Sequence, residues 1–156
     1  MEIRLVEKDA FCVCGYAVET TLAQNDRDVA ALYRDFFENG REAALLSLKG
    51  SAKGYYGVSW YTQGHERYFY LLGIEVGPEN AAPANAVMKS LPKTTYAVAG
   101  FSKGEDIIKA WNDFFYEEIP LSGLSVNAQP NVYFEYYPGA VDSAYELWVP
   151  VMKAEG

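Results

Sequence analysis

The chain has little of what most enzymes and nucleic-acid-binding proteins depend on. Its 156 residues include one histidine, two cysteines and no run of Lys or Arg, and its formal net charge is −8. Phosphate recognition relies on clustered basic side chains, so nucleic acid and anionic membranes are poor partners for this chain. His65 alone supplies neither a usual zinc site nor an obvious Ser–His or Cys–His pair. We therefore expect no metal and no standard hydrolase mechanism.

Long apolar runs are also missing. No segment is apolar and long enough to span a bilayer, and residues 1–10 lack the apolar run of a signal peptide. Cys12 and Cys14 stand in C-x-C spacing, which is not the C-x-x-C of redox or zinc sites and has poor geometry for a disulfide. The expectation is a cytoplasmic protein with two buried thiols and no cofactor.

Aromatic residues are abundant: the chain has thirteen Tyr, eight Phe and three Trp. Rings contribute large buried areas, and Tyr and Trp also carry a polar group. Composition alone leaves two interpretations open, an aromatic core or a pocket lined with rings. The length fits one domain, so residues 1–156 are predicted to fold together.

Three short patterns occur twice in the same order. FCVCGY at 11–16 is similar to YAVAGF at 96–101, and YRDFF at 33–37 is similar to WNDFF at 111–115. A third pair, YLLGIEV and YELWVPV, begins at Tyr70 and Tyr145, and the separations of 85, 78 and 75 residues shrink steadily. This order predicts a duplicated unit, with halves at about 1–77 and 84–156.

Each half reads as strand, helix, strand, strand. Apolar residues recur at helical spacing in both halves: Val29, Leu32, Tyr33, Phe36 and Phe37, then Ile107, Ile108, Trp111, Phe114 and Phe115. Caps at Asn25 or Asp26 and at Asn39-Gly40 bound the first helix, and the second should end before Pro120. We expect core packing for Phe36 and Phe114.

Two strands should follow each helix. They are predicted at about 55–61 and 68–76, and again at 132–137 and 143–151, with turns at Gln63-Gly64 and Pro138-Gly139. The proline-containing segment 77–93 is predicted to be a crossover within one domain, because a half with one helix has little core of its own. The predicted fold class is α+β. Duplicated β-α-β-β units share an antiparallel sheet with two helices on one face, a pseudo-twofold axis and a central ligand cleft.

Four segments of this pattern resemble the GyrI-like small-molecule-binding domain, which also forms the effector-binding domain of AraC-type and MerR-type multidrug regulators. They are YFYLLGIEV at 68–76, PKTTYAV at 92–98, VYFEYY at 132–137 and YELWVPV at 145–151. The corresponding family patterns are Y-x-x-G-x-E-V, P-x-x-x-Y-A-V, F-E-x-Y and E-L-x-I-P-I. The resemblance extends from Phe11 to Val151, and the chain has no room for the regulators' DNA-binding domain, so it is similar to stand-alone members.

The resemblance implies a protein that captures lipophilic, often cationic or aromatic compounds in a central cleft containing a glutamate. Two alternatives stay open. Some similar proteins are hydrolases that open strained cyclopropane-type rings with a Glu and a Tyr. Others modulate DNA gyrase, which would make this chain a protein-interaction module. The oligomeric state is left open.

Glu146 matches the family's cleft glutamate. Strand alternation places Tyr145, Leu147, Val149 and Val151 on one face and Glu146, Trp148 and Pro150 on the other. Glu146 would then either face water or stand beside Trp148 in an aromatic-walled cleft, where it would pair with a cation. The expected ligand contacts are Glu146, Trp148, Trp111, Phe115, Tyr96, Tyr70, Trp60 and Tyr33.

An enzyme would use Glu146 with Tyr137 or Tyr136, depending on strand register. Glu135 matches a strand glutamate of the family, but a surface cross-strand position is an equal alternative.

Overall fold

The computed structural model describes residues 1–61 and 67–153. The strands are β1 (Arg4–Lys8), β2 (Phe11–Thr21), β3 (Tyr55–Tyr61), β4 (Arg67–Val76), β5 (Val87–Leu91), β6 (Thr94–Phe101), β7 (Leu124–Val126), β8 (Val132–Tyr137) and β9 (Tyr145–Lys153). The helical segments are α1 (Asn25–Glu38), α2 (Arg41–Leu46), α3 (Ile107–Asn112), the π-helical η1 (Asp113–Glu118) and α4 (Ile119–Leu121). His65 and the predicted turn at Gln63-Gly64 lie outside the described residues. No helix in the described part is long and apolar enough to cross a membrane.

The fold is α+β, with a nine-stranded antiparallel sheet in the order β1-β6-β9-β8-β3-β4-β2-β5, and β7 added to β9. The β3–β8 pair forms a central seam. Read outward from this seam, one side is β3-β4-β2-β5 and the other is β8-β9-β6-β1. One short strand of each half pairs with a strand of the other half: β1 pairs with β6, and β5 pairs with β2.

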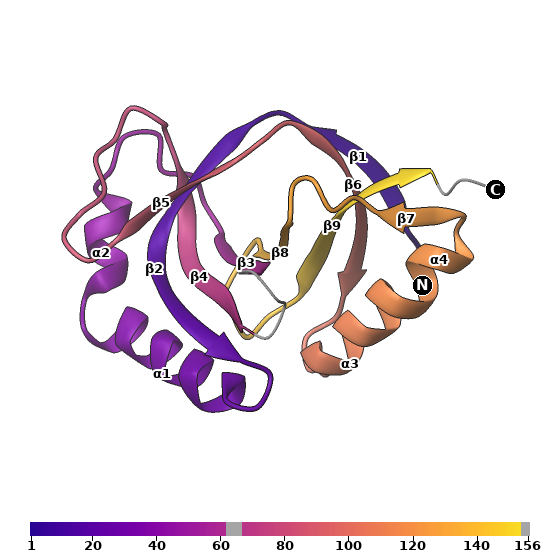
Figure 1. The fold of residues 1–156 in the computed structure, drawn as a ribbon. Helices are drawn as coiled ribbons and strands as arrows, with labels where there is room; N and C mark the ends of the chain where they lie inside the picture. The colour runs from indigo at the N-terminus through magenta and orange to yellow at the C-terminus, as the bar shows by residue number, and fades with distance from the viewer. Residues whose placement is uncertain (62–66, 154–156) are drawn as a thin grey trace.

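The two ends of this strand order are joined through the chain, because β1 leads into β2 and β5 leads into β6. The β1–β6 pair and the β2–β5 pair continue in one register, from Arg4 opposite Val98 to Gly15 opposite Val87. The sheet therefore closes on itself, and Figure 1 shows these strands crossing as an arch above the rest of the sheet. The two ends of the strand order are the five-residue strands β1 and β5, and edges this short offer other chains little to pair with.

The inside of the closed sheet is an aromatic and aliphatic core. Residues from five strands fill it: Val13, Val58, Leu71, Tyr96, Val98 and Phe134 are all buried in one cluster. The ring of Phe11 lies 5.8 Å from that of Phe134, edge to face, which links the crossing strands to the seam. This inner core explains why the strands are apolar on both faces.

Helix α1 covers the outer face of the sheet in one half, and the consecutive segments α3, η1 and α4 cover it in the other (Figure 1). Phe36 of α1 packs among Tyr16 and Tyr55, and Phe114 of η1 packs in the cluster of Leu147. Both phenylalanines are fully buried, so the predicted core positions are confirmed.

The first helix, α1, begins at Asn25 and is followed by Asn39 and Gly40, whose φ of 74° suits glycine, so its predicted end is confirmed. The predicted cap at Asn25 or Asp26 is wrong, because the N-cap residue is Gln24, no side chain caps it, and the Asn25 amide donates to Tyr68 instead. The second helix differs at its end. We predicted that it would end before Pro120, but the helical path continues to Leu121. Pro120 lies in the first turn of α4, where a residue without an N–H is tolerated.

The strands at 55–61 and 132–137 are confirmed with their limits. The other two are confirmed with shifted ends, at Arg67 and at Tyr145 and Lys153. β1, β5, β7 and α2 were not predicted. β5 lies within the segment interpreted as a crossover, where prolines at both ends masked a five-residue strand.

Candidate functional site

Glu135 lies on the outer face of β8, at the middle of the seam between the two halves of the sheet. In β8, alternate side chains turn inward and outward, so Phe134 enters the inner core while Glu135 and Tyr137 face the helices. The residue opposite Glu135 across the seam is Gly57 of β3. Glu135 is only 7% exposed, so its carboxyl group is buried among neighbouring side chains.

Four structural elements meet at this carboxylate. Tyr70 of β4 donates to Glu135 Oε1 at 2.8 Å, and Tyr137 of β8 donates to the same oxygen at 3.0 Å. The indole Nε1 of Trp111, from α3, donates to Oε2 at 2.9 Å. The hydroxyl of Tyr33, from α1, lies 2.6 Å from that of Tyr70. Since Tyr70 gives its own proton to Glu135, Tyr33 is the donor in this second contact.

The electrostatics of the site favour a positive charge. Burial raises the pKa of Glu135, and the hydrogen bonds from Trp111, Tyr70 and Tyr137 oppose that rise. Burial and the negative charge of Glu135 also raise the pKa of Tyr33, Tyr70 and Tyr137, so all three phenols stay protonated. No Lys or Arg of the described chain forms an ion pair with Glu135. A buried carboxylate without a cation is costly unless something compensates it.

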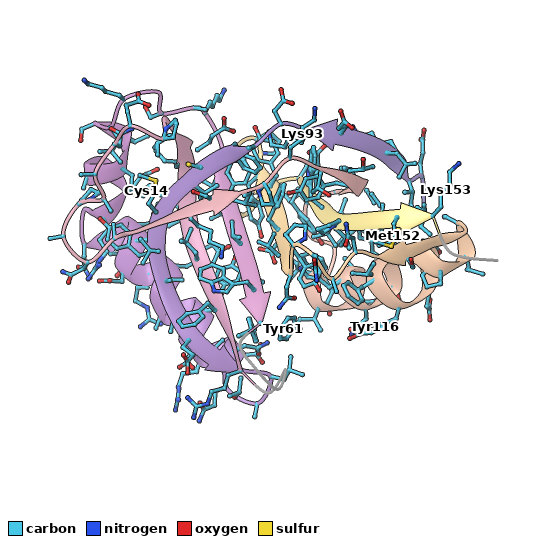
Figure 2. All side chains as sticks on the ribbon, turned by 45° about the horizontal axis from the view of Figure 1, so that its top comes forward. Cys14, Tyr61, Lys93, Tyr116, Met152 and Lys153 are labelled. Atoms are coloured by element: carbon cyan, nitrogen blue, oxygen red, sulfur yellow. The ribbon has the colours of Figure 1, made fainter. Side chains whose placement is uncertain are left out.

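Five further rings extend from this carboxylate along the seam. We call them the aromatic rim: Tyr61, Tyr68, Phe115, Tyr116 and Tyr133. The Tyr61 ring lies 5.7 Å from Tyr68 and 6.2 Å from Tyr133, and Phe115 lies 5.4 Å from Tyr133. Tyr116 is 69% exposed, and Figure 2 shows it on the same side of the molecule as Tyr61. Asn25 Nδ2 donates to the Tyr68 hydroxyl at 3.0 Å, which ties the start of α1 to this rim.

The structure divides the predicted site residues between the two faces of the sheet. Tyr33, Tyr70, Trp111 and Tyr137 meet at Glu135, and Phe115 belongs to the aromatic rim. Glu146, Trp148, Tyr96 and Trp60 lie on the opposite, inner side.

On that inner side Glu146 is paired with a cation from its own chain. Arg4 Nη2 lies 2.7 Å from Glu146 Oε2, and Trp148 Nε1 donates to Oε1 at 3.1 Å. Its side chain is 27% exposed. The predicted neighbourhood with Trp148 is confirmed, but Glu146 does not lie with Trp111 and Tyr70. The contribution of Glu146 to ligand binding stays a prediction.

The predicted catalytic pair of Glu146 and Tyr137 is wrong, because the two side chains are on opposite faces. Register places Tyr136 opposite Glu146, while Tyr137 donates to Glu135. The alternative of a surface position for Glu135 is wrong as well. The sequence contained one signal for it: Glu135 is the acid of the F-E-x-Y pattern and interrupts a strand that is otherwise aromatic and aliphatic.

The remaining inner-side residues have structural partners. The Tyr96 ring packs on Phe134 and Trp148 at 5.3 and 5.5 Å, and its buried hydroxyl has no hydrogen-bond partner in the described structure. Trp60 stacks on Phe69 at 5.3 Å, with Lys89 Nζ 4.3 Å from its ring centre.

Two shallow depressions of about 380 and 350 Å³ lie away from Glu135. The first is lined by Phe101, Tyr145 and Glu146, among others, and the second by Phe11, Cys12 and Glu75. Tyr70, Tyr137 and Trp111 donate to Glu135 and leave its carboxyl group buried, so a ligand that touches the carboxylate must displace some of them. Within the described residues, no group of three His, Cys, Asp or Glu side chains is arranged to hold a metal.

The α+β fold, with a closed antiparallel sheet and helices on its outer face, is the GyrI-like effector-binding fold. The family model that matches the chain is Cass2, the integron-associated effector binding protein, over residues 4–151. The chain belongs to this family.

Solved structures agree on the fold. SAV2435 bound to tetraphenylphosphonium aligns with a TM-score of 0.77 at 16% identity, covering 97% of this chain and 94% of that one. An integron cassette protein from the mobile metagenome of Vibrio cholerae aligns at 0.68 and 16% identity, covering 96% and 95%. The EcmrR C-terminal domain aligns at 0.64 and 14% identity, covering 98% of each chain. No curated protein sequence matches significantly.

Proposed function

We propose that this protein binds lipophilic cations over the β3–β8 seam, between α1 and α3, with Glu135 as the counter-charge. The observation that carries the proposal is a nearly fully buried carboxylate that has three hydrogen-bond donors and no basic partner in the described chain. Hydrogen bonds alone compensate only part of the cost of burying a charge. A cation placed beside Glu135 would supply the rest.

The surrounding rings supply the second half of the recognition. The aromatic rim offers several π faces next to Glu135, and a cation over such a face gains about 0.5–2 kcal/mol. Flat apolar groups on the ligand would bury area against the same rings. Charge and apolar surface together therefore define the ligand class. SAV2435, which shares the fold, binds tetraphenylphosphonium, a cation with both properties.

The two halves of the chain support a symmetric cleft. We infer that they arose by duplication and are related by a pseudo-twofold axis through the β3–β8 seam, because the strand order is the same in both directions from it. The axis would pass close to Gly57 and Glu135, so one half provides the charge and the other provides the glycine that makes room for it. The free thiols Cys12 and Cys14 are in keeping with a cytoplasmic location.

Calorimetric titration with tetraphenylphosphonium tests the proposal. Wild type should show saturable binding, and Glu135→Gln should weaken it at least about tenfold, which corresponds to about 1.4 kcal/mol. Glu146→Gln is the matched control, since it removes the same charge from the other side of the sheet, where Arg4 already pairs with it. Equal binding by wild type and Glu135→Gln would contradict the proposal, and a loss specific to Glu146→Gln would transfer the site to the inner side.

A second candidate function is hydrolysis of a strained-ring electrophile, with Glu135 taking the role first given to Glu146. Tyr137 lies within hydrogen-bond distance of Glu135, and the raised pKa of that carboxyl group suits a general acid or base. Glu135 would accept a proton from water while the water oxygen bonds to one ring carbon and the strained C–C bond to that carbon breaks. The other carbon of that bond keeps the electron pair and then takes the proton back from Glu135. Turnover of a cyclopropane-containing electrophile by wild type, lost in Glu135→Gln, would favour the enzyme over the binding protein.

A further inference from the structure

Lys89 lies on the inner side of the sheet, away from Glu135. It stands in β5 directly opposite Val13 of β2, which belongs to the inner core, so both side chains point to the same side. Lys89 Nζ lies 4.3 Å from the ring centre of Trp60 in β3. The Trp60 ring in turn stacks on Phe69 of β4, with ring centres 5.3 Å apart and 20° between the planes. The amine is therefore held over a surface made of two stacked rings.

The Lys89 side chain reaches this surface from a distant strand. Because β2 and β4 separate β5 from β3 in the strand order, the aliphatic stem must cross the inner side of the sheet to bring Nζ over Trp60. Lys89 is accordingly half-buried. A lysine stem that covers apolar surface normally leaves its charged end in water. Here the charged end itself is placed on an aromatic ring.

No carboxylate balances this charge. None of the ion pairs in the described chain includes Lys89, whereas Lys93 and Lys109 each pair with acidic residues. Burial lowers the pKa of the Lys89 ammonium, because removal from water disfavours the charged form. The face of Trp60 offsets part of that cost, and no acidic side chain offsets the rest. Burial therefore favours the neutral amine, which is the nucleophilic form of lysine.

We propose that Lys89 captures aromatic aldehydes as imines, with the aryl group of the aldehyde packed on Trp60 and Phe69. The neutral amine adds its electron pair to the carbonyl carbon, and the carbonyl oxygen takes up the proton that the nitrogen loses, which gives a carbinolamine. The hydroxyl group then leaves with the second N–H proton as water, and a carbon–nitrogen double bond remains. Nothing is oxidised or reduced, so the step needs no further reactant.

Two physical effects favour this class of compound. Imine formation replaces a half-buried ammonium that has no counter-ion by a less basic group, so burial no longer opposes the form that is present. A flat aryl group also buries apolar area against Trp60 and Phe69, in the stacked or edge-to-face geometry that rings prefer. A small aliphatic aldehyde gains from the first effect only. The pair of rings therefore selects aromatic aldehydes.

Competitive labelling of the whole protein tests the inference. Wild type is treated near neutral pH with limiting 2-naphthaldehyde and sodium cyanoborohydride, which reduces each imine to a stable secondary amine. Peptide mass spectrometry then gives the labelled fraction of each of the eight lysines. Lys8 is the matched control, because its Nζ also lies 4.3 Å from a ring centre, that of Phe11. Lys89 should carry at least about fivefold more label than Lys8, and formaldehyde should narrow this ratio.

Variants separate the amine from the rings. Lys89→Arg keeps a cation over Trp60 but removes the nucleophile, so total label should fall while thermal unfolding and tetraphenylphosphonium binding stay close to wild type. Trp60→Leu removes the ring face, so 2-naphthaldehyde label on Lys89 should fall by about threefold or more, and formaldehyde label should change less. Phe69→Leu removes the second ring and replaces Trp60→Leu in the test if that variant does not fold.

The outcomes that would overturn the inference are distinct from those that bear on the proposed function. Label on Lys89 no higher than on Lys8 would refute capture at this amine. Equal Lys89-to-Lys8 ratios for 2-naphthaldehyde and formaldehyde would refute selection of aromatic aldehydes, and so would unchanged selectivity after loss of either ring. Cation binding is tested at Glu135 on the outer face, so its failure would leave the labelling result unchanged.

Discussion

Gly57 and Glu135 lie directly opposite each other across the β3–β8 seam, and the absence of a side chain on Gly57 makes room for the carboxylate and its donors. A Cβ atom at this position would stand 2.7 Å from Glu135 Oε1 and would overlap the Tyr70 hydroxyl. The glycine is therefore a structural requirement of the site, although it makes no polar contact itself.

The first prediction follows from this contact. Gly57→Ala should push the Tyr70 hydroxyl away from Glu135, lower the free energy of unfolding by about 1–3 kcal/mol and weaken tetraphenylphosphonium binding. Gly100→Ala is the control, because a Cβ atom there meets nothing within 4 Å. Chemical denaturation and calorimetry measure the two effects. A Gly57→Ala protein as stable as the Gly100→Ala protein would show that the seam is not packed as described.

Much of this architecture was predictable from periodicity, but the position of the acid was not. The limits of β3 and β8 and the start of α1 agree with the spacing of apolar residues. Hydrophobic alternation assigns a face only when one face of a strand is exposed. Here the sheet closes around an inner core and carries helices outside, so both faces of the central strands are buried.

That double burial explains why Glu146 was preferred over Glu135. Each is the single acid in a strongly apolar strand, and the sequence does not show that Arg4, 142 residues away, pairs with one of them. The crossing of β1 and β5 to opposite halves was missed for a related reason. Both are five-residue edge strands whose partners lie far away in the sequence, and short segments carry too little periodicity to predict pairing.

The pH dependence of binding provides a second prediction. Tetraphenylphosphonium keeps its charge at every pH, so only the protein titrates. A cation needs the ionised form of Glu135, whose pKa is raised above the ordinary value of 4.5. Affinity should therefore be full at high pH and fall as the pH drops through that raised pKa, a window above the one in which exposed carboxyl groups titrate. Glu135→Gln should bind weakly with no such dependence, and a wild-type profile equal to that of Glu135→Gln would contradict the assignment.

A third prediction concerns the indole of Trp111. Its hydrogen bond lowers the pKa of Glu135 by stabilising the ionised form. Trp111→Phe keeps a ring at the position but removes the donor, so the midpoint of the pH profile should move to higher pH. At a pH well above both midpoints, affinity should differ less between the two proteins than at acidic pH. An unmoved midpoint would mean that the indole does not act on the carboxylate.

The inner core leads to a fourth prediction. Phe134 is buried among Phe11, Tyr96 and Trp148, with ring centres 5.2–5.8 Å apart. Phe134→Ala should lower the free energy of unfolding by about 3–5 kcal/mol, because it leaves a cavity where the two halves meet. Leu121→Ala, at an 81% exposed position, should change it by less than about 0.5 kcal/mol. Similar urea midpoints for the two variants would contradict the closed sheet.

The most direct test of a cation held at Glu135 is a crystal structure with tetraphenylarsonium, the arsenic counterpart of tetraphenylphosphonium, whose anomalous scattering locates the charged atom. We predict a single strong anomalous peak on the outer face of the seam, between α1 and α3, beside Glu135 and the rings of Tyr68 and Tyr133. A peak beside Glu146 and Arg4, on the inner side of the sheet, would contradict this account.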